Sequence, residues 1–231
     1  MNNKLTLLTT KMVRSYSNSY NYPDQSKRTG LAQWIAEIQS VKNNWLVSHR
    51  SDDLLFLKIL CIKGGHQNRM KWIYVVFTIR ALDNCNLFDF TRKHKNFCEL
   101  YQQVTYAVKN IPFAQGLLTR YDISLHIAVL LDSPVYPDHV FLSEHTSKSA
   151  QALGISAFPY ADRSEFSSIF DGLTCMQIED ILCVYSKIIL GDDNNIDEIT
   201  QRSCCYKKKD RDKLITLYRK AESAFIKVRK S

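Results

Sequence analysis

Apolar side chains recur at three- and four-residue spacing along most of the chain, which is the period of an amphipathic α-helix. One such stripe follows Thr29 and contains Leu31, Trp34, Ile35 and Ile38. Further stripes run over residues 54–62, 97–108, 121–130 and 176–188. The pattern therefore predicts a mostly α fold.

Residues 72–79 interrupt this regularity, because the run Trp-Ile-Tyr-Val-Val-Phe-Thr-Ile is rich in β-branched and aromatic side chains. A short run of this kind is typical of either a strand or a fully buried helix. Its helical surroundings favour a helix. The chain has only 7 Gly and 5 Pro, whereas an all-β sandwich or barrel needs many tight turns. We expect a single-domain irregular helical bundle with, at most, one short strand or hairpin.

Small polar residues mark the expected helix starts, since their side chains accept hydrogen bonds from free backbone amides. Asp89 or Thr91 is the expected N-cap of the helix that ends before Pro112. Thr119 is the expected N-cap of the next helix, with Asp122 completing a pair that resembles a capping box. Thr174 is expected to cap the helix that follows it.

The pattern divides the chain into three parts. Residues 1–28 lack a helical stripe and are rich in Ser, Asn and Tyr, so they are interpreted as a flexible N-terminal arm. An organellar transit peptide is the alternative, since residues 1–23 contain no acid. Residues 29–200 are expected to form the helical core domain, and residues 201–231 a basic amphipathic C-terminal helix.

Charge is distributed in blocks along the chain. The net charge is +8, but residues 27–120 contribute +8, residues 121–200 contribute −10, and residues 201–231 contribute +8. Blocks of this size produce surface potentials that attract partners of opposite charge. Either a basic surface is available to a polyanion, or basic and acidic segments neutralise each other within the fold.

Cysteine spacing and hydropathy bear on the compartment. The seven cysteines are odd in number and include no C-x-x-C pair, which favours free, mostly buried thiols in a reducing compartment. No apolar run approaches the ~18 residues of a membrane span, and no secretory signal is evident. We therefore expect a cytoplasmic protein without a membrane span.

The C-terminal segment combines an apolar stripe with closely spaced cations. Ammonium and guanidinium groups at this density bind phosphate backbones and release counterions. The alternative is a helix that docks on the core with a solvated basic face. The predicted nucleic-acid-binding residues are Lys207, Lys208, Lys209, Arg211, Lys213, Arg219 and Lys220.

Residues 119–148 contain the densest group of potentially reactive side chains. A hydrolase or nuclease would use Asp122, His139, Glu144, His145 and Lys148. The His spacing does not match a zinc-protease signature, and no metal site or cofactor is predicted.

His126 lies among apolar residues and is interpreted as a core histidine bonded to backbone. Cys98 lies four residues after His94, so the two would be neighbours on a helix.

About a third of the chain, residues 117–185, resembles a group of uncharacterised bacterial helical proteins. The resemblance is carried by Tyr121-Asp122, Val140-Phe141-Leu142 and Ala152-Leu153-Gly154, and Glu179-Asp180-Ile181 continues it. Where those proteins have a His-Ala-Gly-Thr run, this chain has residues 143–146, Ser-Glu-His-Thr. The resemblance implies a helical fold and no particular activity.

No nucleotide-binding loop, nucleophile elbow or zinc-finger spacing is present in the sequence. We therefore expect an accessory protein that binds nucleic acid or another polyanion without catalysing a reaction. Two alternatives remain open at this point. The chain is a protein–protein interaction subunit of a complex with an enzymatic partner, or it is a hydrolase or nuclease that uses the 119–148 cluster.

Overall fold

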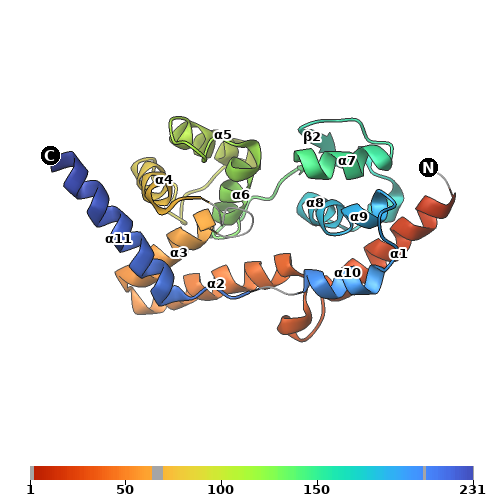
Figure 1. Cartoon of the computed structure of the whole chain (residues 1–231), viewed down its shortest axis with the longest axis horizontal. Coiled ribbons are helices and arrows are strands. Elements are labelled where there is room, and N and C mark those ends of the chain that lie inside the picture. Colours follow the sequence, from red (N-terminus) through yellow and green to blue (C-terminus); the bar gives the residue numbers. More distant parts are fainter. Residues whose placement is uncertain (1–2, 64–69, 205–206, 231) are drawn as a thin grey trace. The chain divides into compact units, whose positions relative to one another are not determined.

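Helices dominate the computed structural model, which describes residues 3–63, 70–204 and 207–230 (Figure 1). The predicted mostly α fold is confirmed. The α-helices are α1 (Asn3–Tyr20), α2 (Gly30–Ser48), α3 (Ser51–Lys63), α4 (Trp72–Asn84), α5 (Phe97–Val108), α6 (Leu117–Ala128), α7 (Glu144–Ala152), α8 (Cys175–Val184), α9 (Ser186–Ile189), α10 (Ile196–Ser203) and α11 (Arg211–Lys230). Short 3-10 helices cover Gln25–Lys27, Arg163–Glu165 and Ser168–Phe170.

The ambiguous run 72–79 lies within α4, so the helix interpretation is correct. Val75, Val76, Ile79 and Leu82 form its buried face, while the remaining apolar residues of the run are half-buried, so apolar side chains surround most of the helix and hide its period. The strands of the described chain lie elsewhere, in β1 (His139–Phe141) and β2 (Tyr160–Asp162). They pair antiparallel, with Val140 opposite Ala161.

The chain divides into two compact units, each built from two separate segments. Unit 1 comprises residues 1–35 and 137–207, and unit 2 comprises residues 36–136 and 208–231. The expected boundaries at residues 28 and 200 do not coincide with this division. The first boundary between the units, at residues 35 and 36, lies inside α2, where the helical pattern continues without a linker or a change in composition.

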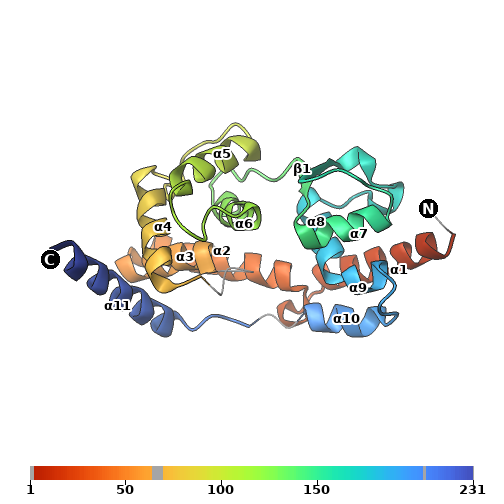
Figure 2. The ribbon, with the colours of Figure 1, turned by 45° about the horizontal axis from the view of Figure 1, so that its top comes forward.

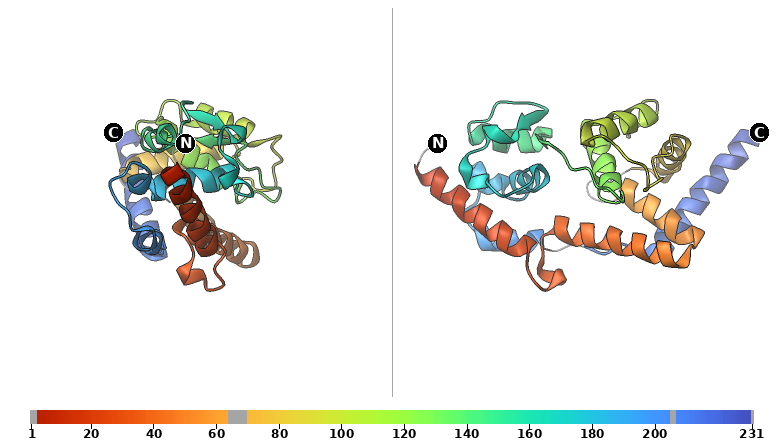
Figure 3. Two further views of the ribbon diagram at one scale, coloured as in Figure 1. Left: turned by 90° about the vertical axis from the view of Figure 1, so that its right-hand side faces the viewer. Right: turned by 180° about the vertical axis from the view of Figure 1, so that it is seen from behind.

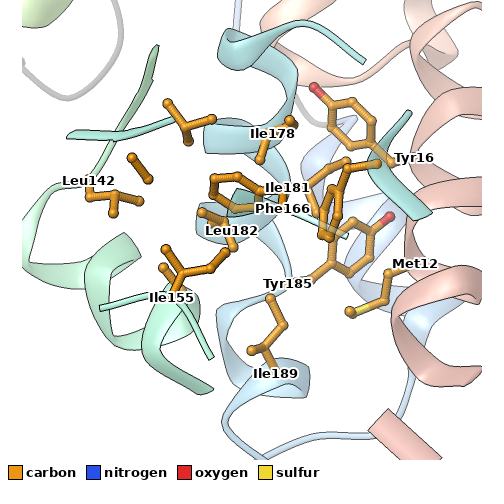
Figure 4. Packing of buried hydrophobic residues seen from close by; sticks show 14 of the residues in the cluster. Met12, Tyr16, Leu142, Ile155, Phe166, Ile178, Ile181, Leu182, Tyr185 and Ile189 are labelled. Atoms are coloured by element: carbon orange, nitrogen blue, oxygen red, sulfur yellow. The ribbon is translucent and has the colours of Figure 1, made fainter. Parts of the chain in front are cut away.

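Unit 1 packs α1, α7, α8, α9 and α10 together with the small sheet (Figure 2). Figure 4 shows its apolar core, in which Ile181 and Leu182 of α8 lie between side chains from α1 and from the region of the sheet. Leu142, Ile155, Phe166 and Ile178 belong to the same cluster and are buried.

The structure corrects the prediction of a flexible N-terminal arm. Residues 3–20 form α1, and Met12 and Tyr16 are completely buried in the core of unit 1. Thr and Ser occupy many of the positions between the apolar residues of α1, which obscures its helical stripe in the sequence. Thr9 and Thr10 bond to carbonyl oxygens four residues earlier, so their hydroxyls are satisfied inside the helix.

Polar contacts also hold α1 in unit 1. The Tyr16 hydroxyl donates to Oδ2 of Asp180 on α8 over 2.5 Å. Thr200 of α10 lies within hydrogen-bond distance of Ser15, at 2.9 Å, and of the Tyr185 hydroxyl, at 2.7 Å. Burial, together with the negative charge of Asp180, raises the pKa of Tyr16 well above its ordinary value. These contacts join α1 to both α8 and α10.

Unit 2 contains α3, α4, α5, α6 and α11, and Figure 3 shows α11 beside α3. Leu57, Val76, Val104 and Ile123 each contribute a fully buried side chain from one of the first four helices. His126 is a buried core residue, as predicted, and its Nδ1 lies 2.6 Å from the carbonyl oxygen of Cys61. This contact ties α6 to α3.

Two of the three expected helix caps differ in the structure. Asn96 caps α5, because its side chain accepts from the Glu99 amide at 3.0 Å, and Asp89 lies in an earlier turn. Gly116 caps α6, and its carbonyl accepts from the Arg120 amide. Thr119 is therefore inside the first turn, and it does not form the expected cap. Thr174 caps α8 in a capping box, as predicted.

The six described cysteines are free, in agreement with the sequence. Only Cys61 and Cys175 among them are buried, so the expectation of mostly buried thiols is wrong, and Cys205 lies outside the described residues. Across the described residues, no helix combines the length and the apolar character that a membrane crossing requires.

Candidate nucleic-acid interface

The two compact units differ in charge. By sequence, the segments of unit 1 contain 10 basic and 12 acidic side chains, a net charge of −2. Those of unit 2 contain 21 basic and 11 acidic side chains, a net charge of +10. The excess positive charge of the molecule therefore belongs to unit 2, which includes α11.

The apolar stripe of α11 attaches the helix to α3 and α4. Ile215 and Tyr218 are buried, and the ring of Phe225 packs edge-on against Phe77, with centroids 5.0 Å apart. The Arg80 guanidinium lies 4.8 Å from the centroid of Phe225 and donates to Glu222 at 3.0 Å. One side of α11 is thus fixed to unit 2.

Both predicted arginines of α11 bond to aspartates at the start of α3. Arg211 bonds to Asp53, with Nη2 2.7 Å from Oδ1, and Arg219 forms an ion pair with Asp52. Arg211 also bonds to its neighbour Asp212 at 2.9 Å. These arginines therefore contribute to the attachment of α11, and much of their charge is offset within unit 2.

Lys213 and Lys220 of α11 have a different environment. Lys213 and Lys220 are exposed, and their ammonium groups form no hydrogen bond or ion pair with any residue that the structure describes. They lie two helical turns apart, a rise of about 10 Å. Thr216 and Ser223 are exposed at the intervening and following positions. We call Lys213, Thr216, Lys220 and Ser223 the basic face of α11.

The remaining predicted residues precede α11. Lys207 and Lys208 are exposed, whereas Lys209 is half-buried and its backbone amide lies 3.4 Å from Oε1 of Glu37. Arg211 and Arg219 of α11 pair with aspartates at the start of α3, outside the acidic segment 121–200. The acidic segment does engage other cations, for example Asp132 with Lys42 at 2.7 Å.

The five predicted catalytic residues do not form one group. Asp122 is buried on α6 of unit 2, whereas the other four belong to unit 1. His139, on β1, lies 3.2 Å from both Asp138 and Asp162. His145 bonds to Ser186 at 2.9 Å. Glu144 and Lys148 are exposed on α7.

Among the described residues, no group of three or more His, Cys, Asp or Glu side chains is arranged to hold a metal ion.

His94 and Cys98 do not form the His–Cys contact that would activate a thiol. His94 is buried, and neither of its ring nitrogens has a hydrogen-bond partner among the residues that the structure describes. Burial and the nearby charge of Arg92 lower the pKa of His94. Cys98 is exposed, and its sulfur lies 3.6 Å from Nε2 of Gln102. Nothing in this arrangement activates the thiol.

Sequence reasoning missed two exposed aromatic residues of unit 2. Tyr106 and Phe113 are both 64 % exposed. The Lys109 ammonium lies 3.9 Å from the centroid of Tyr106, and the ring of Phe113 packs against Tyr74 at 5.1 Å. The available signal was the position of Tyr106 outside the apolar stripe of its helix, one turn before a lysine.

No protein-family model matches the chain, and comparisons with curated proteins and with solved structures gave no match. Any functional conclusion therefore depends on the charge, exposure and geometry of the chain's own residues.

Proposed function

We propose that the protein binds nucleic acid, or another polyanion of similar charge density, through the basic face of α11. The observation that carries this proposal is the environment of Lys213 and Lys220, which are exposed on a docked helix and have no partner in the described chain. Binding of phosphates by such groups releases condensed counterions and requires no loss of internal ion pairs.

The fixed side of α11 supports the same proposal. Burial of Ile215 and Tyr218 limits the motion of the helix, so the backbone positions of the two lysines are set before a ligand arrives. The hydroxyl of Thr216, between these cations, and that of Ser223, after Lys220, are suited to hydrogen bonds with phosphate oxygens. Lys208, which is exposed in the same unit, would extend the contact beyond the helix.

Charge neutralisation tests the proposal. The variant K213Q/K220Q should weaken binding of a labelled DNA or RNA, measured by fluorescence anisotropy at several salt concentrations. If each lysine contacts one phosphate, the slope of log affinity against log salt should fall by about 1 to 2. The matched control is K148Q/K187Q, which removes two exposed lysines from unit 1.

Two results would contradict the proposal. One is the absence of any affinity for DNA, RNA or polyphosphate at low salt in the unmodified protein. The other is an equal loss of affinity in both double variants, since that result would reflect net charge and not this surface. Purification as a stable complex with another protein, free of nucleic acid, would favour the interaction-subunit alternative.

A further inference from the structure

An open groove lies along α5 on the surface of unit 2, with a volume of about 430 Å³. Binding sites for small ligands have volumes of roughly 300–1,000 Å³, so the groove is large enough for one nucleobase. The groove is lined by Cys85, Arg92, Glu99, Gln102, Gln103 and Tyr106.

Tyr106 forms the end of this groove that lies farthest along α5. The buried side of the helix is made by Leu100, Val104 and Val108, so the ring of Tyr106 does not belong to the core. Lys109 lies over the ring, and the residue as a whole is still 64 % exposed. An exposed aromatic ring beside a cation is suited to stack a base while the cation meets a phosphate.

The lining of the groove also includes a cation, Arg92. Arg92 is held there by a hydrogen bond of 3.0 Å from Nη1 to the carbonyl oxygen of Cys85. Lys93 and Lys95 follow it and are exposed. Gln102 also lines the groove, is exposed, and has an amide that can bond to the edge of a base.

The negative charge of Glu99 determines which part of a nucleotide can occupy the groove. Its Oε2 accepts from the Lys95 amide at 2.6 Å, and its Oε1 accepts from Nε2 of Gln103 at 3.1 Å. The carboxylate is therefore fixed in the groove and would repel a phosphate placed there. A neutral base avoids this repulsion, and its phosphates would lie outside, near Lys93, Lys95 and Lys109.

We infer that the groove of α5 holds an unpaired base of a single-stranded nucleic acid, stacked on Tyr106. This inference rests on the proposed function and adds a substrate class to it. A base within a duplex is already stacked on its neighbours, so its face cannot meet the ring without opening of the helix. The groove thus favours single strands, whereas the lysines of α11 do not distinguish the two forms.

The test compares Y106A with Y106F and with F113A. Phe113 is the matched control, because it is equally exposed in the same unit and does not line the groove. Binding of a labelled single strand of about 12 nucleotides and of a duplex of equal length is measured by anisotropy. Circular dichroism confirms that each variant is folded.

Y106A should weaken single-strand binding about tenfold and change duplex binding less than about twofold, whereas Y106F and F113A should stay close to the unmodified protein. Equal losses in Y106A and F113A, or equal effects on single strand and duplex, would overturn the stacking site and leave the function of α11 intact. Absence of binding to either form would instead overturn the proposed function itself.

Discussion

The guanidinium group of Arg211 donates two hydrogen bonds to one carboxylate oxygen of Asp53, from Nη2 at 2.7 Å and from Nε at 3.1 Å. The other oxygen of Asp53 accepts from the Ser48 hydroxyl at 2.7 Å. The Ser48 bond and the Arg211 guanidinium lower the pKa of Asp53. The first turn of α11 is therefore attached to the first turn of α3 by a charged contact with defined geometry.

A double-mutant cycle should detect this contact in the free energy of unfolding. The coupling between R211A and D53A should be about 1 kcal/mol, because Asp53 is mostly buried and Arg211 is only partly exposed. The coupling between R219A and D52A should be smaller, since Arg219 is 58 % exposed. Urea unfolding of the single and double variants measures both values. Equal couplings would contradict the assignment of Asp53 as the main anchor.

The same contact has a defined pH dependence. Folding lowers the pKa of Asp53, so its contribution to stability is present above its ordinary pKa of 3.8 and is lost as the pH falls through the folded value. Between pH 7 and pH 3, D53N should therefore lose less stability than the unmodified protein. A parallel decline in the two proteins would show that Asp53 does not titrate differently on folding.

Tyr218 should make the stability of unit 2 sensitive to alkaline pH. Burial, followed by the charge of Glu222, raises the pKa of Tyr218 to about 12. Between its ordinary value of 10.0 and this value, the unfolded chain loses a proton that the folded chain retains. Its contribution to the free energy of unfolding should thus fall by about 1 kcal/mol per pH unit in that range. Unfolding of Y218F and of the unmodified protein at pH 9 and pH 11 measures the difference. An identical decline would contradict it.

Helix α1 should contribute to stability, in contrast to a flexible arm. Met12 is completely buried, and its replacement in M12A should cost about 2–5 kcal/mol through lost contacts and a cavity. Leu7 lies on the same helix and is 59 % exposed, so L7A should cost less than about 1 kcal/mol. Thermal and urea unfolding of the two variants provide the comparison. A negligible effect of M12A would restore the interpretation as an arm.

Helix existence could be predicted from the sequence wherever apolar residues repeat at helical spacing, as in α5 and α8. The prediction failed for α1, because its interior contains Thr residues whose hydroxyls bond to the helix's own carbonyls. It also failed at the start of α6, where Gly116 provides no side-chain cap and Thr119 is a better cap by residue type. In α1, burial of Met12 and Tyr16 outweighs the local propensity.

The division into units could not be predicted, since each unit joins segments that are far apart in sequence. The candidate interface was predicted in part. Composition located the cations of residues 207–220, but only the structure separates Arg211 and Arg219, which pair with Asp53 and Asp52, from Lys213 and Lys220. That distinction depends on long-range contacts, which spacing along one helix does not contain.

Gly30 lies at the start of α2, and its replacement by Ala should lower the stability of the protein, although such replacements usually raise it. Replacement of Gly by Ala near the start of a helix normally stabilises a protein by up to about 1 kcal/mol, because the unfolded chain loses conformational freedom. At Gly30, however, a Cβ atom would lie 3.0 Å from the backbone carbonyl oxygen of Ser203. Backbone atoms cannot rotate away as a flexible side chain does, so α10 or α2 would have to shift.

G30A should therefore destabilise the protein by about 1 kcal/mol or more in urea unfolding, since the steric cost exceeds the gain in helix propensity. Ser203 is the last residue of α10, and Thr200 of the same helix bonds to Ser15 and Tyr185. A shift of α10 would therefore disturb the contacts of α1. The variant T200V, which removes those bonds without a clash, should then be less than additive with G30A. Stabilisation by G30A would mean that the approach of α2 to α10 is looser than the structure shows, and full additivity would mean that the two sites are independent.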